Sequence, residues 1–408
     1  MMRTIIFFIV AAIILTTSCV PVANNTKTAT PVIFTTEAAV TETLTPTKSP
    51  ATIPEQGFKI TIQCLGIQPS IPYDFESEGD IVLKDYYDNR TLFDIHPSSA
   101  NASKTIFGEG FLYPFISPNK KMLAYLDISD VDAPKLKMVN IRNEIQVTIP
   151  WLDDWGYLAG WINDNQLYIS PYGQEQMIVF DPFIENTKNI AFDQFPEFNF
   201  IPRDHWVEYD PTLNRVIYPK GGSLALFDVE SSQVLAEVPT GVVRLPGDIS
   251  WTINGDYVAV IGSIFPQTDN MGDELFIITR DGVSMQVTNL TNYYGKGISL
   301  SYPRWSPSGK RLAFWEMDSL NKYQDRKLLV VDLSAKQVTD YCISTSPDNY
   351  GNFGEALPAP IWSPDGTQLL VETRYSQDHS DVVLLDITKN IAIKIAENAR
   401  PIGWMISP

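Results

Sequence analysis

The sequence has few of the residues on which metal and nucleophilic chemistry depend. Its 408 residues include three cysteines and three histidines, and His96, His205 and His379 are scattered along the chain. Metal clusters and Ser/His/Asp sets need such side chains in groups that converge on one point. We therefore expect no catalytic residues and no cofactor, and this scarcity favours a protein that is not an enzyme.

Positive charge is also scarce. The chain has 30 Lys and Arg against 48 Asp and Glu, which gives a formal net charge of -18 without a basic patch. Such a charge argues against nucleic acid or anionic lipid head groups as partners. It suits solubility outside the cell.

Sustained helical periodicity is missing beyond the N-terminus, and a repeated phrase stands out instead. Trp305-Ser-Pro-Ser-Gly309 and Trp362-Ser-Pro-Asp-Gly366 each lie between an apolar approach and a strand-like run. Pro presets φ for a turn, the polar fourth residue can bond the backbone, and Gly supplies a positive φ. Each phrase therefore predicts a tight hairpin.

Weaker copies of the hairpin recur upstream. The aligned aromatic or apolar positions are spaced by 45, 48, 42, 54 and 57 residues, at Ile116, Trp161, Tyr209, Trp251, Trp305 and Trp362. Two further strand-like runs follow each hairpin. Four strands per repeat, arranged radially, predict an all-β protein with the four-stranded blades of a β-propeller.

The two strong phrases, Trp305 to Phe314 and Trp362 to Val371, resemble the WSPDG-type, WD-repeat-like repeats of TolB-like β-propellers. The resemblance extends over residues 59–408. Similar propellers occur in prolyl oligopeptidase-type enzymes, which also carry a hydrolase domain. Because this chain ends inside its last repeat, we expect no such domain. The resemblance implies the fold and leaves the function open.

The chain ends on Ile406-Ser-Pro408, which aligns with Ile116-Ser-Pro118 at the end of a first strand. The other strands of that last blade are expected from the segments 58–64, 80–86 and 91–97. We therefore expect seven blades, with a closing blade shared by both ends of the domain. If 58–97 formed a separate cap, the ring would have six blades.

The N-terminus predicts export. Arg3 precedes an apolar run from Ile5 to Leu15 that is short for a membrane span and suits a signal peptide at residues 1–18. Cys19 follows small residues, as in bacterial lipoprotein signals, although Thr16 replaces the usual Leu. Residues 19–57 then predict a lipidated cysteine and a disordered Thr/Pro-rich tether, and residues 58–408 the propeller. The alternative is a secreted, soluble protein.

The two remaining cysteines are Cys64 and Cys342. The alignment puts Cys64 in the closing blade and Cys342 in the outer strand of a blade that is not its neighbour. Cysteines whose Cα atoms lie more than about 7 Å apart cannot be bridged. We expect two free, buried thiols.

The loops expected on the face opposite the WSPDG turns are long and rich in aromatic residues. Loops on a rigid scaffold often carry binding residues, and exposed aromatic rings suit peptides or sugars. The candidate ligand-binding residues are Phe198, Tyr293, Tyr294, Tyr323, Tyr350, Phe353 and Tyr375. For each one, packing of its loop onto the blade is the competing interpretation.

One loop offers candidate metal ligands. Asp127, Asp130 and Asp132 could surround a calcium ion, although their spacing differs from that of an EF-hand and the later Glu is missing.

Together these patterns predict a non-catalytic, monomeric binding or scaffold propeller, anchored to a membrane through a lipid at Cys19 and facing the outside or the periplasm. The expected partner is an envelope protein, a peptide or a glycan. The alternative is a propeller hydrolase or lyase that acts on a peptide or polysaccharide.

Overall fold

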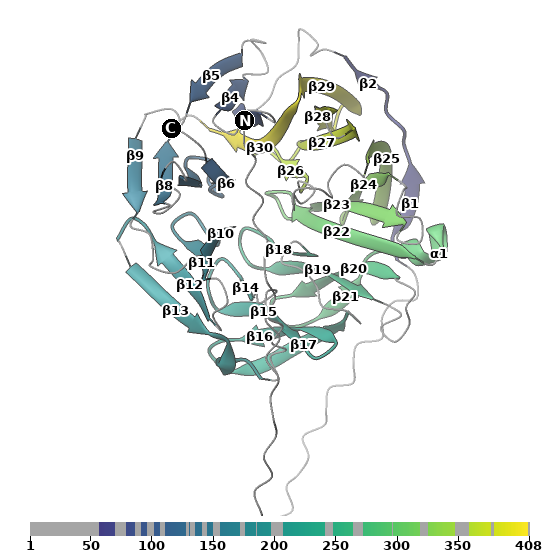
Figure 1. Cartoon of the computed structure of the whole chain (residues 1–408). Helices are drawn as coiled ribbons and strands as arrows, with labels where there is room; N and C mark the ends of the chain where they lie inside the picture. The colour runs from purple at the N-terminus through teal and green to yellow at the C-terminus, as the bar shows by residue number, and fades with distance from the viewer. Residues whose placement is uncertain are drawn as a thin grey trace, which may run out of the picture. The chain divides into compact units, whose positions relative to one another are not determined.

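The computed structural model describes residues 57–69, 79–85, 91–95, 102–106, 111–127, 130, 135–140, 145–149, 156–171, 176–184, 186–196, 207–240, 248–263, 272–295, 297–318, 325–346, 359–376 and 379–406. The predicted signal peptide, Cys19 and the tether up to residue 56 lie outside the described residues. Within the described residues the strands form seven sheets, which are arranged around a common centre (Figure 1).

Each sheet is a blade whose first strand lies nearest the centre (Figure 1). From the centre outward, blade 1 holds β6 (Phe111–Ile116), β7 (Leu123–Asp127), β8 (Lys135–Asn140) and β9 (Ile145–Ile149); blade 2 holds β10 (Gly156–Trp161), β11 (Leu167–Pro171), β12 (Gln176–Asp181) and β13 (Asn186–Ala191); blade 3 holds β14 (Glu208–Tyr209), β15 (Arg215–Lys220), β16 (Ser223–Asp228) and β17 (Gln233–Pro239); blade 4 holds β18 (Ile249–Trp251), β19 (Tyr257–Ser263), β20 (Asp273–Thr279) and β21 (Ser284–Gln286).

The last three blades draw on both ends of the domain. Blade 5 holds β22 (Ile298–Trp305), β23 (Arg311–Asp318), β24 (Arg326–Asp332), β25 (Gln337–Thr345) and β1 (Lys59–Ile62); blade 6 holds β26 (Ile361–Trp362), β27 (Gln368–Ser376), β28 (His379–Asp386), β29 (Ile391–Glu397) and β2 (Ile67–Gln68); blade 7 holds β30 (Ala399–Met405), β3 (Asp80–Asp85), β4 (Thr91–Ile95) and β5 (Ala102–Ile106). Two short helices, η1 (Phe192–Gln194) and α1 (Leu290–Tyr294), complete the described elements.

The core is divided among the contacts between blades. Seven clusters of buried side chains are found in the described residues, one between each pair of neighbouring blades, and one of them joins Met405 of blade 7 to Leu123 of blade 1. Because each sheet is covered on both faces, its middle strands are continuous apolar runs, such as Val258 to Ile261 of β19. The contact between blades 7 and 1 closes the ring.

The repeated phrases form the hairpins that the sequence predicts. In the second phrase the Ser363 hydroxyl donates to the Asp365 carboxylate at 2.6 Å and accepts from the Gln368 backbone N–H at 2.9 Å. Gly366 has a φ of +72° and donates its N–H to the Ser363 carbonyl. Ser363 and Asp365 stabilise the turn by hydrogen bonds, and Gly366 adopts the positive φ that the turn requires. These requirements explain why the same phrase recurs in the sequence.

The closing blade is shared by both ends of the domain, as predicted. β30 pairs antiparallel with β3, from Ala399 opposite Asp85 to Met405 opposite Asp80. The segments near 80–86 and 91–97 supply β3 and β4. The third expected segment, 58–64, is not part of this blade, whose outer strand is β5.

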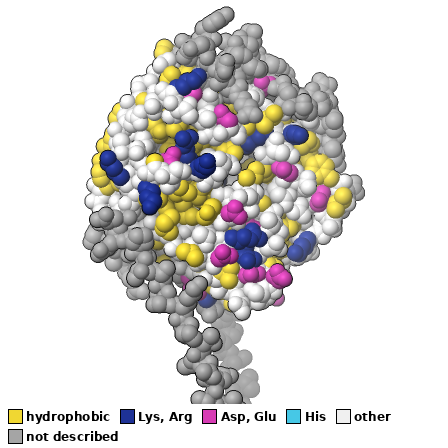
Figure 2. All heavy atoms as spheres, turned by 180° about the vertical axis from the view of Figure 1, so that it is seen from behind, with side chains coloured by type: hydrophobic (Ala, Val, Ile, Leu, Met, Phe, Trp, Pro, Cys, Tyr) yellow, Lys and Arg dark blue, Asp and Glu magenta, His cyan; other side chains and the backbone are white. Residues whose placement is uncertain are grey.

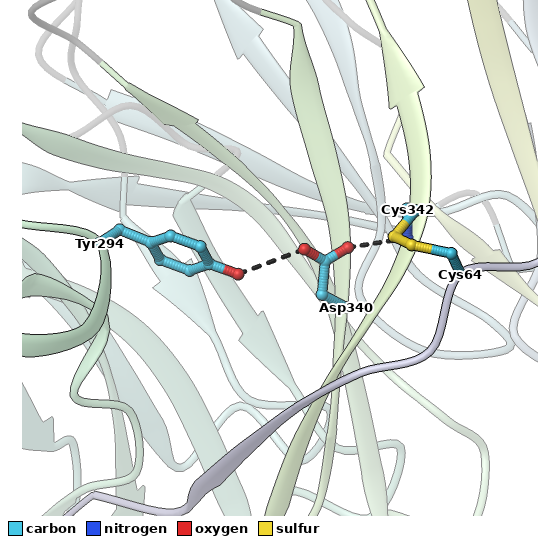
Figure 3. Close-up of a disulfide and its surroundings, with 4 residues drawn as sticks. All are labelled: Cys64, Tyr294, Asp340 and Cys342. Carbon is cyan, nitrogen blue, oxygen red and sulfur yellow. Dashed lines mark hydrogen bonds between the residues drawn. A yellow bond between two sulfur atoms is a disulfide. The ribbon is translucent and has the colours of Figure 1, made fainter.

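The prediction of free thiols at Cys64 and Cys342 is wrong. Residues 57–68, here called the N-terminal strap, run along the rim, where β1 pairs parallel with β25 and β2 pairs parallel with β29. The strap places Cys64 beside Cys342 of blade 5 with a Cα–Cα distance of 4.7 Å, and the two form a disulfide (Figure 3). The error came from assigning segment 58–64 to blade 7.

Candidate binding site at the central channel

The repeated tryptophans join neighbouring blades at the channel. Each donates its indole N–H to a backbone carbonyl in the first strand of the preceding blade. The four bonds are Trp161 to Phe115 at 3.0 Å, Trp251 to Glu208 at 3.3 Å, Trp305 to Ser250 at 2.9 Å and Trp362 to Arg304 at 2.8 Å. The rings are thereby fixed in place around the centre.

A cavity of about 850 Å³ lies inside this ring of tryptophans. Its wall includes the short turns between first and second strands, such as Asn163, Pro211 and Pro307. The cavity therefore lies at the end of the channel where the WSPDG-type turns are, and we call this side of the propeller the short-turn face.

In each repeat, the residue directly before the aligned aromatic or apolar residue at the end of the first strand also lines the cavity. In blades 1 to 6 these residues are Phe115, Gly160, Glu208, Ser250, Arg304 and Ile361. Glu208 and Arg304 are the ionisable members of this layer. They come from blades 3 and 5, with blade 4 between them.

Glu208 has no hydrogen-bond or ion-pair partner for its carboxylate among the described residues. Burial raises the pKa of this carboxyl group to about 7, and the nearby Arg304 opposes that rise. The side chain is half-buried, since part of its surface faces the cavity. The carboxylate oxygens of Glu208 can therefore accept hydrogen bonds from a ligand in the cavity.

The guanidinium group of Arg304 is hydrogen-bonded to the protein through one of its three nitrogens. One of its terminal nitrogens, Nη1, donates to the Pro303 carbonyl at 2.8 Å and to the Ile249 carbonyl at 3.5 Å. Burial lowers the pKa of the guanidinium, and Glu208 raises it in turn. No bond of Nε or Nη2 is found in the described part of the chain, so these donors remain for a ligand.

Apolar side chains project from the turns on the short-turn face. Phe183 (53% exposed) and Ile184 (68%) lie in the third-to-fourth turn of blade 2, and Ile253 (53%) and Val283 (52%) lie in turns of blade 4. Ile253 also lines the cavity. We call Phe183, Ile184, Ile253 and Val283 the apolar rim. Figure 2 shows one face of the propeller, on which hydrophobic side chains lie among basic and acidic ones.

Two of the seven predicted ligand-binding residues have described side chains, and both lie on α1. Tyr293 is 51% exposed. Tyr294 instead donates its hydroxyl to Asp340 at 3.2 Å (Figure 3) and lies under Lys327, whose Nζ is 4.9 Å from the ring centroid. These contacts are of the kind that the competing interpretation, packing of the loop onto the blade, describes, and ligand binding by Tyr293 and Tyr294 stays a prediction.

The other predicted ligand-binding residues stay predictions. Tyr375 lies within β27, and its side chain is not described. Phe198, Tyr323, Tyr350 and Phe353 lie outside the described residues.

The calcium hypothesis also stays a prediction. Asp127 forms an ion pair with Lys137, Asp130 is described, and Asp132 lies outside the described residues. Among the residues whose placement is described, no group of three His, Cys, Asp or Glu could hold a metal ion.

The sequence interpretation missed Glu208 and Arg304. The signal was present, because each precedes an aromatic residue of the repeat by one position. Successive residues of a strand point to opposite faces, so a repeat that fixes the aromatic ring also fixes where its neighbour points.

In the described part of the chain, no helix has both the length and the apolar character needed to cross a membrane.

The fold and the site define a β-propeller with a lined channel. Similar solved structures include TolB from Acinetobacter baumannii (12% identity, 81% of this chain and 65% of that chain, TM-score 0.44), hydrazine synthase of Kuenenia stuttgartiensis (14%, 68% and 76%, 0.43) and a functionally unknown protein from Desulfotomaculum acetoxidans (10%, 81% and 100%, 0.48). The chain thus covers less than two thirds of the TolB chain. No family model and no curated protein matches the sequence. At these identities the likeness concerns the fold alone.

Proposed function

We propose that the protein is a non-catalytic binding propeller that recognises an envelope protein or peptide through its short-turn face. The observation that carries this proposal is the cavity of about 850 Å³, a volume within the range of known ligand sites, next to exposed apolar side chains. Exposed apolar groups beside a concave site favour a partner with apolar side chains of its own. The opposite face of the propeller, which carries the long loops and the ligand-binding residues predicted from the sequence, is here called the long-loop face.

The test is site-specific photo-crosslinking in the native envelope. A photoreactive phenylalanine analogue replaces Ile253 on the apolar rim, or Ile62, which is equally exposed at 53% but lies on the N-terminal strap. We expect a discrete adduct from position 253 and none from position 62. Ile184→Glu should abolish the adduct from position 253.

The long-loop face is tested in the same experiment. A probe at Tyr293, which is 51% exposed, reports on that side. An adduct from position 293 with none from position 253 would overturn our choice of face.

The proposal includes a lipid tether, which is supported by the sequence of residues 1–57. A lipid at Cys19 followed by a long Thr/Pro-rich spacer would hold the propeller away from the membrane surface. Labelling with radioactive palmitate should be lost in Cys19→Ala. Labelling that persists in this variant would leave a secreted, soluble protein as the better description.

One observation favours a second candidate, an enzyme such as a hydrolase or lyase. A carboxyl group with a pKa near 7 beside an arginine in a cavity is typical of acid–base catalysis. Incubation with peptide and polysaccharide libraries separates the two functions. Turnover that is lost in Glu208→Gln would support the enzyme, whereas binding without turnover supports our proposal.

A further inference from the structure

Among the residues that precede the repeated aromatic positions, two carry opposite charges that are near enough to influence each other but are not bonded to each other. Lys120 and Asp164, on turns of blades 1 and 2, also line the cavity and act on each other. Glu208 and Arg304 shift each other's pKa, yet no ion pair joins them in the described residues. Blade 4 lies between them and contributes the small Ser250 to the same layer. The space between Glu208 and Arg304, here called the gap, therefore has the carboxylate oxygens of Glu208 as acceptors on one side and the Nε and Nη2 groups of Arg304 as donors on the other.

The chemistry of a ligand for this gap follows from charge balance. A cation would pair with Glu208 and leave Asp248 as the remaining carboxylate that attracts the guanidinium of Arg304, whereas an anion would pair with Arg304 and remove its attraction for Glu208. An unpaired charge in a partly dehydrated site is costly. A neutral group that donates one hydrogen bond and accepts another satisfies both residues at once.

Both amides and sugar hydroxyls meet that requirement, but the surroundings favour an amide. Around Glu208 and Arg304 the cavity wall contains Trp161, Trp251 and Ile361. Outside it, the apolar rim adds Ile184 and Val283, which are aliphatic and exposed. A peptide that enters the channel leaves apolar side chains over this rim, whereas a sugar would cover aliphatic groups with hydroxyls.

We propose that Glu208 and Arg304 together hold one backbone amide of an extended peptide, with Glu208 accepting from its N–H and Arg304 donating to its carbonyl. This inference rests on the proposed function and names the ligand class of the same site. The peptide enters from the short-turn face, and its neighbouring side chains contact the tryptophans and the apolar rim.

The experiment begins with a probe of defined chemistry. Peptides selected from a random dodecapeptide library on the intact domain are resynthesised with one backbone amide at a time replaced by an ester, which removes the N–H. Binding is measured by fluorescence anisotropy. One ester position should weaken binding to the wild type about tenfold, the effect of losing a hydrogen bond to a charged group.

Variants then identify the partner of that amide. In Glu208→Ala the same ester should cause a change of less than about twofold, because the acceptor is already missing. Arg304→Ala should weaken the all-amide peptide, again by about tenfold. Glu230→Gln removes an equal charge from an exposed turn on the same face and should change nothing. Thermal unfolding and the milder Glu208→Gln check that a loss of binding is not a loss of folding.

The outcomes separate this inference from the proposed function. If Ile253→Glu abolishes peptide binding while Glu208→Ala and Arg304→Ala do not, the face is right and the amide site is overturned. The amide site would also be overturned if no single ester substitution weakened peptide binding. The same holds if the sensitive ester weakened binding equally in the wild type and in Glu208→Ala. Failure of the library to yield any binder, or binding to a glycan array through Glu208 instead, would reject the peptide as ligand class.

Discussion

Cys64 and Cys342 form a disulfide across 278 positions of sequence, and it fixes the N-terminal strap to the outer strand of blade 5. The backbone hydrogen bonds from Gln63 N–H to the Asp340 carbonyl at 2.7 Å and from Leu65 N–H to the Tyr341 carbonyl at 3.2 Å lie beside it. The same rim strand therefore receives the strap through both covalent and hydrogen bonds.

The first prediction is that the disulfide contributes strongly to stability. A cross-link across so long a segment restricts the unfolded chain, and the loop-entropy relation gives about 5.6 kcal/mol. Cys64→Ser with Cys342→Ser should lower the free energy of unfolding by up to that amount in urea titrations. Wild-type protein in reductant should match the double variant, whereas an unchanged midpoint would show that the bridge does not constrain the unfolded chain.

The second prediction concerns the indole bonds between blades. Trp305→Phe keeps most of the apolar ring but leaves the buried Ser250 carbonyl without the donor that lies 2.9 Å away. We expect a loss of about 1 to 3 kcal/mol in the free energy of unfolding. Trp251→Phe, whose bond is longer at 3.3 Å and whose ring is half-buried, should cost less. The reverse order in urea titrations would contradict this account.

The third prediction concerns the turn of blade 4. Gly255 has a φ of +72°, and a Cβ there would lie 2.8 Å from an Asp210 carboxylate oxygen that accepts from Arg280 at 2.6 Å. Gly255→Ala should therefore cost about 3 kcal/mol, from backbone strain and the disturbed ion pair. Gly221→Ala is the control, because its φ is +57° but nothing lies within 4 Å, and it should cost about 1 kcal/mol. Equal thermal unfolding midpoints for Gly255→Ala and Gly221→Ala would show that the Asp210–Arg280 ion pair can move away from the added Cβ without cost.

The local parts of this fold could be predicted from the sequence. The hairpins at Trp305 and Trp362 depend on residues within one turn, and their repetition gives the blades and the position of the aromatic rings. The sharing of the last blade by both ends of the domain was also predicted, although the segment 58–64 was wrongly included in it.

The strap and the site could not be predicted in the same way. The segment 58–64 was correctly interpreted as a strand, but its partner is chosen by a parallel contact with β25, far away in sequence. No local pattern specifies such a contact. Glu208 and Arg304 were overlooked because each interrupts the apolar approach to its turn. Their shared position, one residue before the repeated aromatic residue, was a signal in the sequence, but the closed ring is needed to bring that position of blades 1 to 6 to one cavity.

The last prediction is a pH dependence that arises at Glu316, away from the channel. This residue of β23 is 3% exposed and lies opposite Lys327 of β24. Burial raises its pKa from 4.5 to about 7, Asp340 and Asp318 add to the rise, and Lys327 opposes it. The folded state thus holds a proton over a pH range in which the unfolded chain has released it.

The sign follows from the proton count. The stability that Glu316 contributes in its protonated form is complete below pH 4.5 and is lost as the pH rises through about 7. Glu316→Gln, which stays neutral, should unfold much like the wild type at pH 4.5 and be more stable at pH 8, by at most about 3 kcal/mol. Glu208 titrates in the same range, but it is present in both proteins and cancels in their difference. Exposed Glu230→Gln should show no such trend, and a difference between Glu316→Gln and wild type that stays constant from pH 4.5 to 8 would contradict the burial of a proton at this site.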